Sequence, residues 1–171
     1  MNTKAIILML SVLPLTPAQN VTIVAGSATD ANYLGLPCAS YPAAGWTCAY
    51  SDASLPAAFP TLRYGQVVHY SVPTAPGVYV GWVTLVEPNK TAAGQRLLTI
   101  TVQGQTSAPV DVFACAGGAD LPCRFLFLAV SAVGTIDIQI TGTLGNAVVS
   151  EIDWAGIVID TPTALTIQAP Q

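Results

Sequence analysis

The sequence VYVGWVTLVEPNKTAAGQRLLTITVQGQ, residues 78–105, contains two strand-forming runs on either side of a polar turn. Both runs are rich in Val, Thr, Leu and Ile, which favour β-strands. The first run is apolar on both faces, which predicts a central strand that is covered on both sides. The second run alternates, with Leu98, Ile100 and Val102 on one face, as expected of a half-buried strand. The polar turn between the runs contains Glu87, Asn89, Lys90, Gln95 and Arg96.

The same pattern extends over the rest of the chain, where turn residues recur every 8–12 positions and helical periodicity is nearly absent. TIDIQITG (135–142) alternates with Ile136, Ile138 and Ile140 on one face. RYGQVVHYSVP upstream and NAVVSEIDWAGIVID downstream supply further strands. This spacing predicts an all-β sandwich or barrel.

The segment 25–59 differs from the rest because it is rich in Gly, Ala, Ser and Pro. It also carries two cysteines and four aromatic residues before Phe59, namely Tyr33, Tyr41, Trp46 and Tyr50. A disordered linker rarely has so many rings. We therefore predict a long, disulfide-stapled loop on the sandwich, and such loops commonly carry function.

The length of 171 residues, 52% of them hydrophobic, fits one domain. Lys4 followed by the apolar run Ala5–Leu13 and small Ala18 is typical of a secretory signal, cut near Ala18, and the run is too short to span a bilayer. The alternative is that this stretch forms a first strand or a disordered tail. The predicted division is a signal peptide (1–18), a β-sandwich domain (19–162) and a C-terminal tail (163–171).

The chain has five basic and nine acidic residues, which give a net charge of −4. So few Lys and Arg side chains cannot neutralise a phosphate backbone, so nucleic acid is excluded as a partner. They also form no polybasic patch for anionic lipids. We expect a secreted protein, extracellular or at the cell surface, whose mature chain is not inserted in a membrane.

The four cysteines form two close pairs in the sequence, with nine residues between Cys38 and Cys48 and seven between Cys115 and Cys123. An even number in a secreted chain favours disulfides. Of the three possible connectivities we favour the two local pairs, 38–48 and 115–123. The spacings do not fit a zinc site. We expect no metal or cofactor. A structural calcium ion is the alternative, although no carboxylate cluster in the sequence requires one.

Two N-x-[ST] motifs occur, at Asn20 and Asn89. In a eukaryotic secretory route both are predicted glycan sites on exposed turns. Asn20 lies almost at the predicted new N-terminus, so Asn89 is the better candidate.

Catalytic groups are sparse. The single histidine, His69, lies in the middle of a strand without a Ser or Cys nucleophile nearby, and all four cysteines are predicted to be paired. Glu151 and Asp153 share one strand face about 7 Å apart, a spacing that would suit an inverting glycosidase. Such pairs are common on exposed strands, however, so we predict that the protein is not an enzyme.

Carbohydrate binding fits the composition better than catalysis. Sugars present apolar C–H faces and radial hydroxyl groups, so their sites combine flat aromatic rings with a few planar polar side chains. We expect Trp82, Trp154 and Tyr79 to be core rings. Four other rings are less easily placed in a core: Tyr33, Tyr41, Trp46 and Tyr64.

The order of these motifs resembles the malectin-like domain family. The elements that carry the resemblance are Arg63–Tyr64, Tyr70–Pro73, Gly77–Tyr79, Glu87 and Gly94–Gln95–Arg96. VDVFACAGG, NAVVSEIDWAGIVI and, more loosely, VTIVAGS resemble further strands of the family, so the resemblance covers about residues 21–160.

This resemblance implies a two-sheet antiparallel jelly-roll β-sandwich of the galactose-binding type, with carbohydrate bound by loops at one end and no catalysis. Tyr64 matches a sugar-stacking tyrosine of the family, and Asp160 loosely matches a late binding aspartate. The family's Tyr–Phe pair after the glutamate is replaced here by PNK, and Tyr41 or Tyr50 would have to replace an upstream loop tyrosine.

Two functional hypotheses follow. The first is a carbohydrate-binding domain that takes a glycan or glycoprotein, with a site drawn from Tyr64, Tyr41, Trp46, Glu87, Asn89 and Asp160. In it we predict that Gln95 and Arg96 have a structural role, satisfying neighbouring loop carbonyls. The second is a structural or assembly subunit that binds itself or other surface proteins, which the low charge and the missing Tyr–Phe pair favour.

Overall fold

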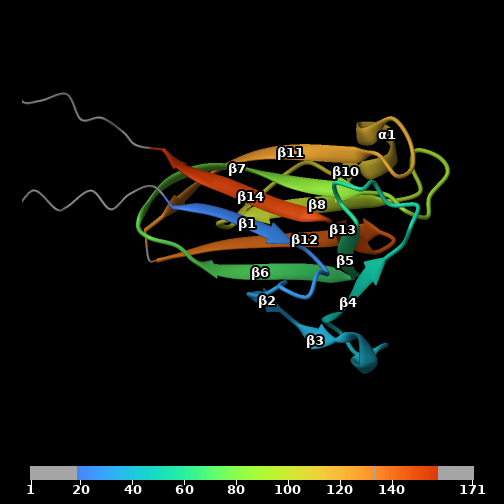
Figure 1. Cartoon of the computed structure of the whole chain (residues 1–171), viewed down its shortest axis with the longest axis horizontal. Helices are drawn as coiled ribbons and strands as arrows, with labels where there is room; N and C mark the ends of the chain where they lie inside the picture. Colours follow the sequence, from blue (N-terminus) through green and yellow to red (C-terminus); the bar gives the residue numbers. More distant parts are fainter. Residues whose placement is uncertain (1–18, 133, 158–171) are drawn as a thin grey trace, which may run out of the picture.

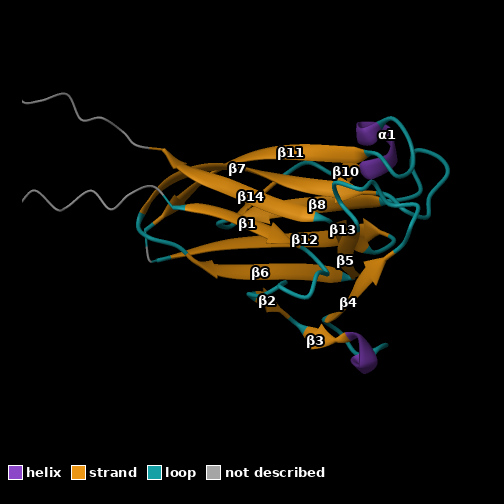
Figure 2. Ribbon diagram, in the orientation of Figure 1, coloured by secondary structure: helices purple, strands orange, loops and turns teal. Residues whose placement is uncertain are grey.

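The structure is a computed structural model that describes residues 19–132 and 134–157. The chain is nearly all β, which confirms the predicted fold class (Figures 1 and 2). Sheet A has the order β1 (Asn20–Val24), β14 (Glu151–Ile157), β7 (Gly77–Val86) and β11 (Pro122–Ser131). Sheet B has the order β10 (Val110–Asp111), β8 (Leu97–Val102), β12 (Thr135–Leu144), β6 (Val67–Pro73) and β2 (Tyr33–Leu34), and β9 (Gln105–Thr106) pairs with β8.

A third, smaller sheet lies at one end of the sandwich. Sheet C has the order β13 (Ala147–Val149), β5 (Thr61–Gly65), β4 (Trp46–Ser51) and β3 (Leu36–Pro37). Every pairing in the three sheets is antiparallel except β3 with β4. The two helical segments are short, η1 (Cys38–Ser40) and α1 (Val112–Ala116). Neither of these helices, the ones found in the described residues, has the length and apolar character needed to cross a membrane.

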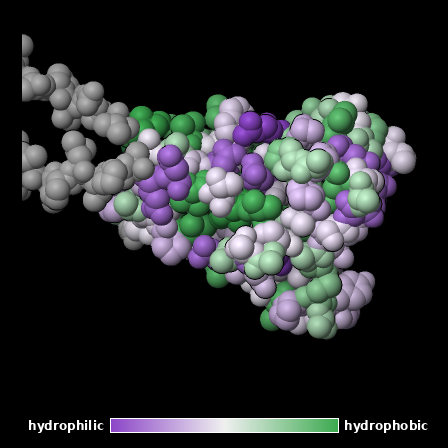
Figure 3. Space-filling model, in the orientation of Figure 1, coloured by the Kyte–Doolittle hydropathy of each residue, from purple (hydrophilic) through white to green (hydrophobic). Residues whose placement is uncertain are grey.

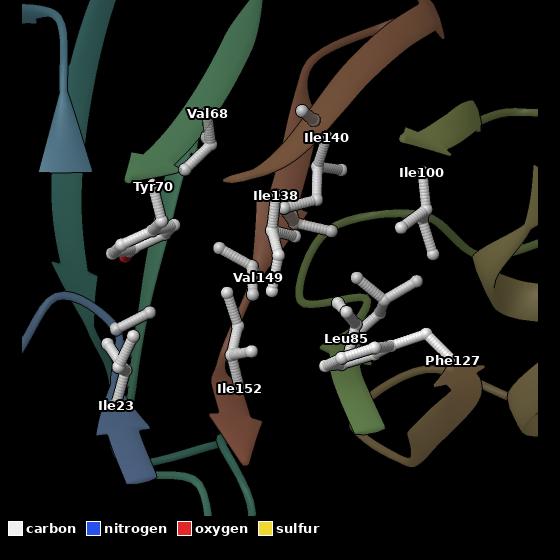
Figure 4. Packing of buried hydrophobic residues seen from close by; sticks show 14 of the residues in the cluster. Ile23, Val68, Tyr70, Leu85, Ile100, Phe127, Ile138, Ile140, Val149 and Ile152 are labelled. Carbon is white, nitrogen blue, oxygen red and sulfur yellow. The ribbon is translucent and has the colours of Figure 1, made fainter. Parts of the chain in front are cut away.

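The core lies between sheets A and B, where the inward faces of alternating strands meet. Ile136, Ile138 and Ile140 of β12 are fully buried, as their alternation predicts. Ile152 and Leu85 of sheet A pack against this row from the other side (Figure 4). The hydrophobic effect of burying these side chains therefore joins the two sheets and fixes which face of each strand is turned inward.

The prediction that both faces of residues 78–86 are covered is only partly correct. Val83 to Val86 are buried, but Val78, Val80 and Trp82 on the outer face of sheet A are only half-buried. The reason is that no other element packs on this part of sheet A among the described residues, so side chains there meet solvent on one side.

The segment 25–59 is not one long loop, as predicted from its composition, because it contains β2, β3, η1 and β4. β4 pairs with β5 from Thr47 to Ser51, so its backbone hydrogen bonds are satisfied by a strand that follows it in the sequence. The disulfide Cys38–Cys48 ties η1 to β4, and Cys115–Cys123 ties α1 to β11. These are the two local pairs that the spacing favours.

Both ends of the described chain lie at the end of the sandwich opposite sheet C (Figure 1). The predicted signal peptide, the C-terminal tail and Asp160 lie outside the described residues. Asn20 is exposed at the first position of β1, and Asn89 is exposed in the loop after β7.

Candidate functional site

The Arg63–Tyr64 pair lies on β5, and strand alternation sends the two side chains to opposite faces. Arg63 is buried and forms an ion pair with Asp30, with both its Nε and Nη2 atoms 2.6 Å from Asp30 Oδ2. The guanidinium group also stacks on the ring of Tyr33 at 3.7 Å. Arg63 thus anchors the segment after β1 to β5, while Tyr64 points to the other face, where it is only partly buried.

The loop after β7 is held by a buried charge pair. Glu87 is fully buried, and its carboxylate accepts hydrogen bonds from Arg96 and from the backbone N–H groups of Asn89 and Lys90, both at 2.9 Å. Arg96 also donates to the backbone carbonyl of Asn146 in the turn before β13. One guanidinium group therefore joins two loops that are 50 residues apart in the sequence.

This arrangement corrects the expectation that Glu87 contacts a sugar directly. Its side chain has no exposed surface and its oxygens are occupied by the guanidinium group and two backbone N–H groups. Glu87 therefore stabilises the conformation of the loop from inside the protein. Arg96 satisfies a loop carbonyl, as expected, whereas Gln95 binds a backbone N–H group rather than a carbonyl: its Oε1 accepts from Thr91 N–H at 3.1 Å.

These loops and sheet C surround a small cavity of about 170 Å³. Its lining comes from β4, β5, β13 and the two loops: Tyr50, Leu62, Tyr64, Pro88, Asn89, Arg96, Asn146 and Val148. The volume is below the range of roughly 300–1,000 Å³ that is typical of sites for drug-sized ligands. The cavity, called the loop pocket below, is therefore sized for one ring or one terminal group of a larger ligand.

Four aromatic rings form a continuous row across sheet C into the loop pocket. Tyr41 contacts Trp46 with ring centroids 5.1 Å apart, Trp46 contacts Tyr64 at 5.7 Å, and Tyr64 contacts Tyr50 at 6.4 Å. Each contact is edge-to-face, a favoured geometry for aromatic pairs. Tyr41 at the outer end is 67% exposed. This aromatic row leads from solvent to the pocket and offers flat apolar surface along the way.

Arg96 is the one charged side chain among the described residues that line the loop pocket. The positive charge of Arg96 is compensated by Glu87, which lies behind it. Burial, with the Asp52 carboxylate beside it adding to the effect, raises the pKa of the Tyr50 hydroxyl, so this group stays protonated and able to donate at neutral pH. Amide, phenol and backbone groups next to apolar rings suit a neutral, hydroxyl-rich ligand better than an anion.

The structure brings together most of the residues that the sequence proposed. Tyr64 and Asn89 line the loop pocket, and Tyr41 and Trp46 connect to Tyr64 through the aromatic row. Asn146 was missed by sequence reasoning. A Gly-Asn turn before a strand is a signal for an exposed amide, but nothing local in the sequence places that turn beside Glu87.

The candidate catalytic groups lie elsewhere. His69 Nε2 is 3.3 Å from Asp137 Oδ1 on the outer side of sheet B. Glu151 and Asp153 lie on the open outer face of sheet A, where Asp153 pairs with Arg124 at 3.1 Å. Burial, with the Asp153 charge adding to it, raises the pKa of Glu151. Within the described ranges no group of three potential metal-ligating side chains comes together.

Neither a family model nor a curated protein matches this chain. Among solved structures, the plant receptor-like kinase ANX2 is similar with a TM-score of 0.63 at 14% identity, over 84% of this chain and 49% of that one. The ANX1 ectodomain from Arabidopsis thaliana gives a TM-score of 0.62 at 12% identity, over 84% of this chain and 50% of that one. A β-glucuronidase of Bacteroides uniformis gives 0.59 at 16% identity, over 82% of this chain and 18% of that one.

At these identities the comparisons show the fold alone. The receptor ectodomains have malectin-like domains, so the malectin-like fold that the sequence resemblance implies is confirmed. This chain spans about half the length of the receptor chains that it matches.

Proposed function

We propose that this protein is a non-catalytic carbohydrate-binding domain that acts outside the cell or at its surface. The observation that carries the proposal is the aromatic row Tyr41–Trp46–Tyr64–Tyr50, which ends in an uncharged polar pocket. Rings of this kind pack against the C–H faces of sugars, and the amide and phenol groups bind hydroxyl groups.

The dimensions of the site indicate how a glycan would sit. The loop pocket takes one terminal sugar unit, placed against Tyr64 and bound by Asn89 and Tyr50. Because the row continues outward through Trp46 to exposed Tyr41, the following units of an oligosaccharide would lie along sheet C. The expected ligand is therefore a neutral oligosaccharide, and longer chains are expected to bind more tightly than a single sugar.

The protein is expected to bind glycans without hydrolysing them. No carboxylate is among the described side chains that line the loop pocket; Glu87 is fully buried behind its wall and paired with Arg96, and Asp52 lies beside Tyr50. Glycoside hydrolysis commonly requires two carboxyl groups that flank the scissile bond. The Glu151–Asp153 pair lies on the outer face of sheet A rather than among these rings.

A glycan array tests this function, with the wild-type protein beside Tyr64→Ala and Tyr64→Phe. We expect wild-type binding to neutral oligosaccharides, a loss of about 10- to 100-fold in Tyr64→Ala, and little change in Tyr64→Phe, which keeps the ring. Circular dichroism and thermal melting of the variants check that both are folded. Full binding by a folded Tyr64→Ala protein would refute the assignment of the site.

Tyr41→Ala separates the outer part of the aromatic row from the pocket. Because Tyr41 is exposed and distant from the loop pocket, its removal should weaken binding of an oligosaccharide but leave that of a monosaccharide unchanged. Equal effects on both ligands would contradict the proposed direction of the glycan.

A second candidate function is that of a structural or assembly subunit of the cell surface. The observation that favours it is a row of exposed aliphatic side chains on β11, described below. A lack of binding to any glycan on a broad array, together with self-association, would favour this second function over the first.

A further inference from the structure

Strand β11 exposes an unusual amount of apolar surface at the edge of sheet A (Figure 1). Leu126, Leu128 and Val130 are 53%, 66% and 58% exposed, and they alternate along the outer face of the strand. Figure 3 shows that hydrophobic patches (green) also lie between polar ones on the face of the molecule seen in Figure 1. Single exposed apolar residues are normal, but a contiguous row on one strand marks an interaction surface.

On the outer edge of β11, the backbone groups of Leu126 and Leu128 have no partner strand in the described part of the chain. In an antiparallel pair, alternate residues direct both their N–H and C=O groups to the same side. The carbonyl of Val130 accepts a hydrogen bond from Gln103 Nε2 at 3.0 Å, so it points away from β7. The register between β11 and β7 is continuous, and therefore Leu126 and Leu128 also direct their backbone groups away from the sheet. No hydrogen-bond partner for these groups occurs among the described residues.

Apart from the contact of Gln103 with the Val130 carbonyl, the edge also has none of the features by which proteins usually prevent strand addition. Such edges are blunted by charged side chains, proline, bulges or a covering segment. Between Phe125 and Ser131 β11 has no charged residue and no proline, and its pairing with β7 has no bulge. A groove of about 230 Å³ runs beside the edge, with Leu126 and Leu128 on one side and Gln105 and Thr106 on the other.

We propose that β11 pairs antiparallel with β11 of a second copy of this chain, forming a two-fold dimer with one continuous sheet. A two-fold axis at Phe127 places Leu126 opposite Leu128 of the second copy. Each of the two resulting pairs exchanges both N–H···O=C bonds, which satisfies the unpaired backbone groups. The four leucine side chains then cover one another.

A second copy fits this edge better than a peptide of different chemistry because the edge is self-complementary. Antiparallel pairing places Leu126 against Leu128 of the second copy, and it brings no charges of like sign together because Arg124 of each copy lies opposite Val130 of the other. A charged peptide would leave its charges unpaired at the leucines. This inference does not depend on carbohydrate binding, because the loop pocket is built by sheet C and the adjoining loops rather than by β11.

The expected dimer is weak. Seven residues from Arg124 to Val130 span about 23 Å, a narrow contact that is smaller than the roughly 800 Å² per partner of a stable complex. We therefore expect a dissociation constant on the order of 10 µM, as for other small interfaces. Sedimentation velocity of the folded protein over about 1–500 µM should show a concentration-dependent shift from monomer to dimer. A protein that stays monomeric throughout this range would overturn the proposal.

Leu128→Lys tests the location, with Leu144→Lys as its control. Both leucines are exposed, Leu144 by 48%, but Leu144 lies at the end of β12 in sheet B. Leu128→Lys should weaken dimerisation at least 10-fold, because each lysine is placed against a leucine of the second copy. Leu144→Lys should leave it unchanged. Equal weakening by the two variants would show that β11 is not the interface.

Leu126→Pro tests whether the contact runs through the backbone. Its N–H points away from β7, so proline removes no hydrogen bond within the monomer and is tolerated at such an edge. Leu126→Ala also loses the leucine side chain but keeps this N–H group. Dimerisation should be weaker in the proline variant than in the alanine variant, and the amides of Leu126 and Leu128 should become protected from hydrogen exchange only at high concentration. Equal affinities of the two variants, or amides that exchange freely in the dimer, would overturn strand pairing.

Discussion

Arg96→Ala is the substitution whose effect the structure defines most closely. It removes a guanidinium group that pairs with the fully buried Glu87 and that also binds the backbone carbonyl of Asn146. Removing one partner of a buried ion pair costs about 3–5 kcal/mol, because an uncompensated charge stays in the interior. Glu87 keeps two backbone N–H donors, from Asn89 and Lys90, which places the expected loss at about 3 kcal/mol.

The assay is unfolding in guanidinium chloride followed by circular dichroism, with thermal melting as a second measure. For a domain of this size, a loss of about 3 kcal/mol corresponds to a fall in Tm of roughly 10 °C. Arg124→Ala is the matched control, since Arg124 pairs with Asp153 at an exposed site. Exposed pairs contribute about 0–1 kcal/mol, so this control should change stability little.

The double variant Arg96→Ala/Glu87→Gln isolates the cause. Glutamine keeps an oxygen acceptor for the loop N–H groups but carries no charge. If the buried charge is the source of the loss, the double variant should be more stable than Arg96→Ala alone. A loss below about 1 kcal/mol in Arg96→Ala, or a double variant that is less stable than the single one, would refute this reasoning.

The remaining predictions concern the loops and the outer face of sheet A. In a eukaryotic host we expect a glycan on Asn89, which lines the loop pocket, to weaken ligand binding. Thr91→Ala removes the glycosylation motif but keeps Asn89, so it should restore binding. Mass spectrometry detects the glycan, and a binding assay measures its effect. Replacing Cys38 and Cys48 by Ser should lower the free energy of unfolding by about 2–3 kcal/mol in calorimetry, because the disulfide closes a short loop. An unchanged transition would show that η1 is held by packing alone. Because burial raises the pKa of Glu151 in the folded state, its charged form opposes folding as pH rises through that raised pKa. Glu151→Gln should therefore be at least as stable as wild type at pH 7 and give no gain at pH 3, and a variant that is less stable at pH 7 would contradict this.

The strands of the core could be predicted from the sequence because each is a local pattern. Alternation places Ile136, Ile138 and Ile140 on one face, and a face that is apolar in every strand must be turned inward. The bond from Arg96, which directly precedes β8, to the carbonyl of Asn146 agrees with the expectation that this residue serves a neighbouring loop carbonyl.

The burial of Glu87 could not be predicted in the same way. A glutamate at the end of a strand can lie in solvent or in the interior, and its environment depends on where Arg96 and the loop backbone fold back. The composition of residues 25–59 likewise led to the wrong prediction of a long loop. β4 forms in this segment because it pairs with β5, a contact that composition does not show.

Local sequence patterns, alternation for the strands and spacing for the cysteines, were thus sufficient to identify the all-β class and the two local disulfides. The loop pocket and the open edge of β11 depended on contacts between distant segments. Tyr64 of β5 and Asn89 of the loop after β7 line the same pocket, and Arg96 ties this loop to the Asn146 turn beside them. Leu126 and Leu128 resemble core residues in the sequence, and they are exposed because, among the described residues, no element packs on the outer face of sheet A at β11. Side-chain alternation is set by the backbone of a single strand, whereas the neighbours of each strand are set by the packing of the whole chain.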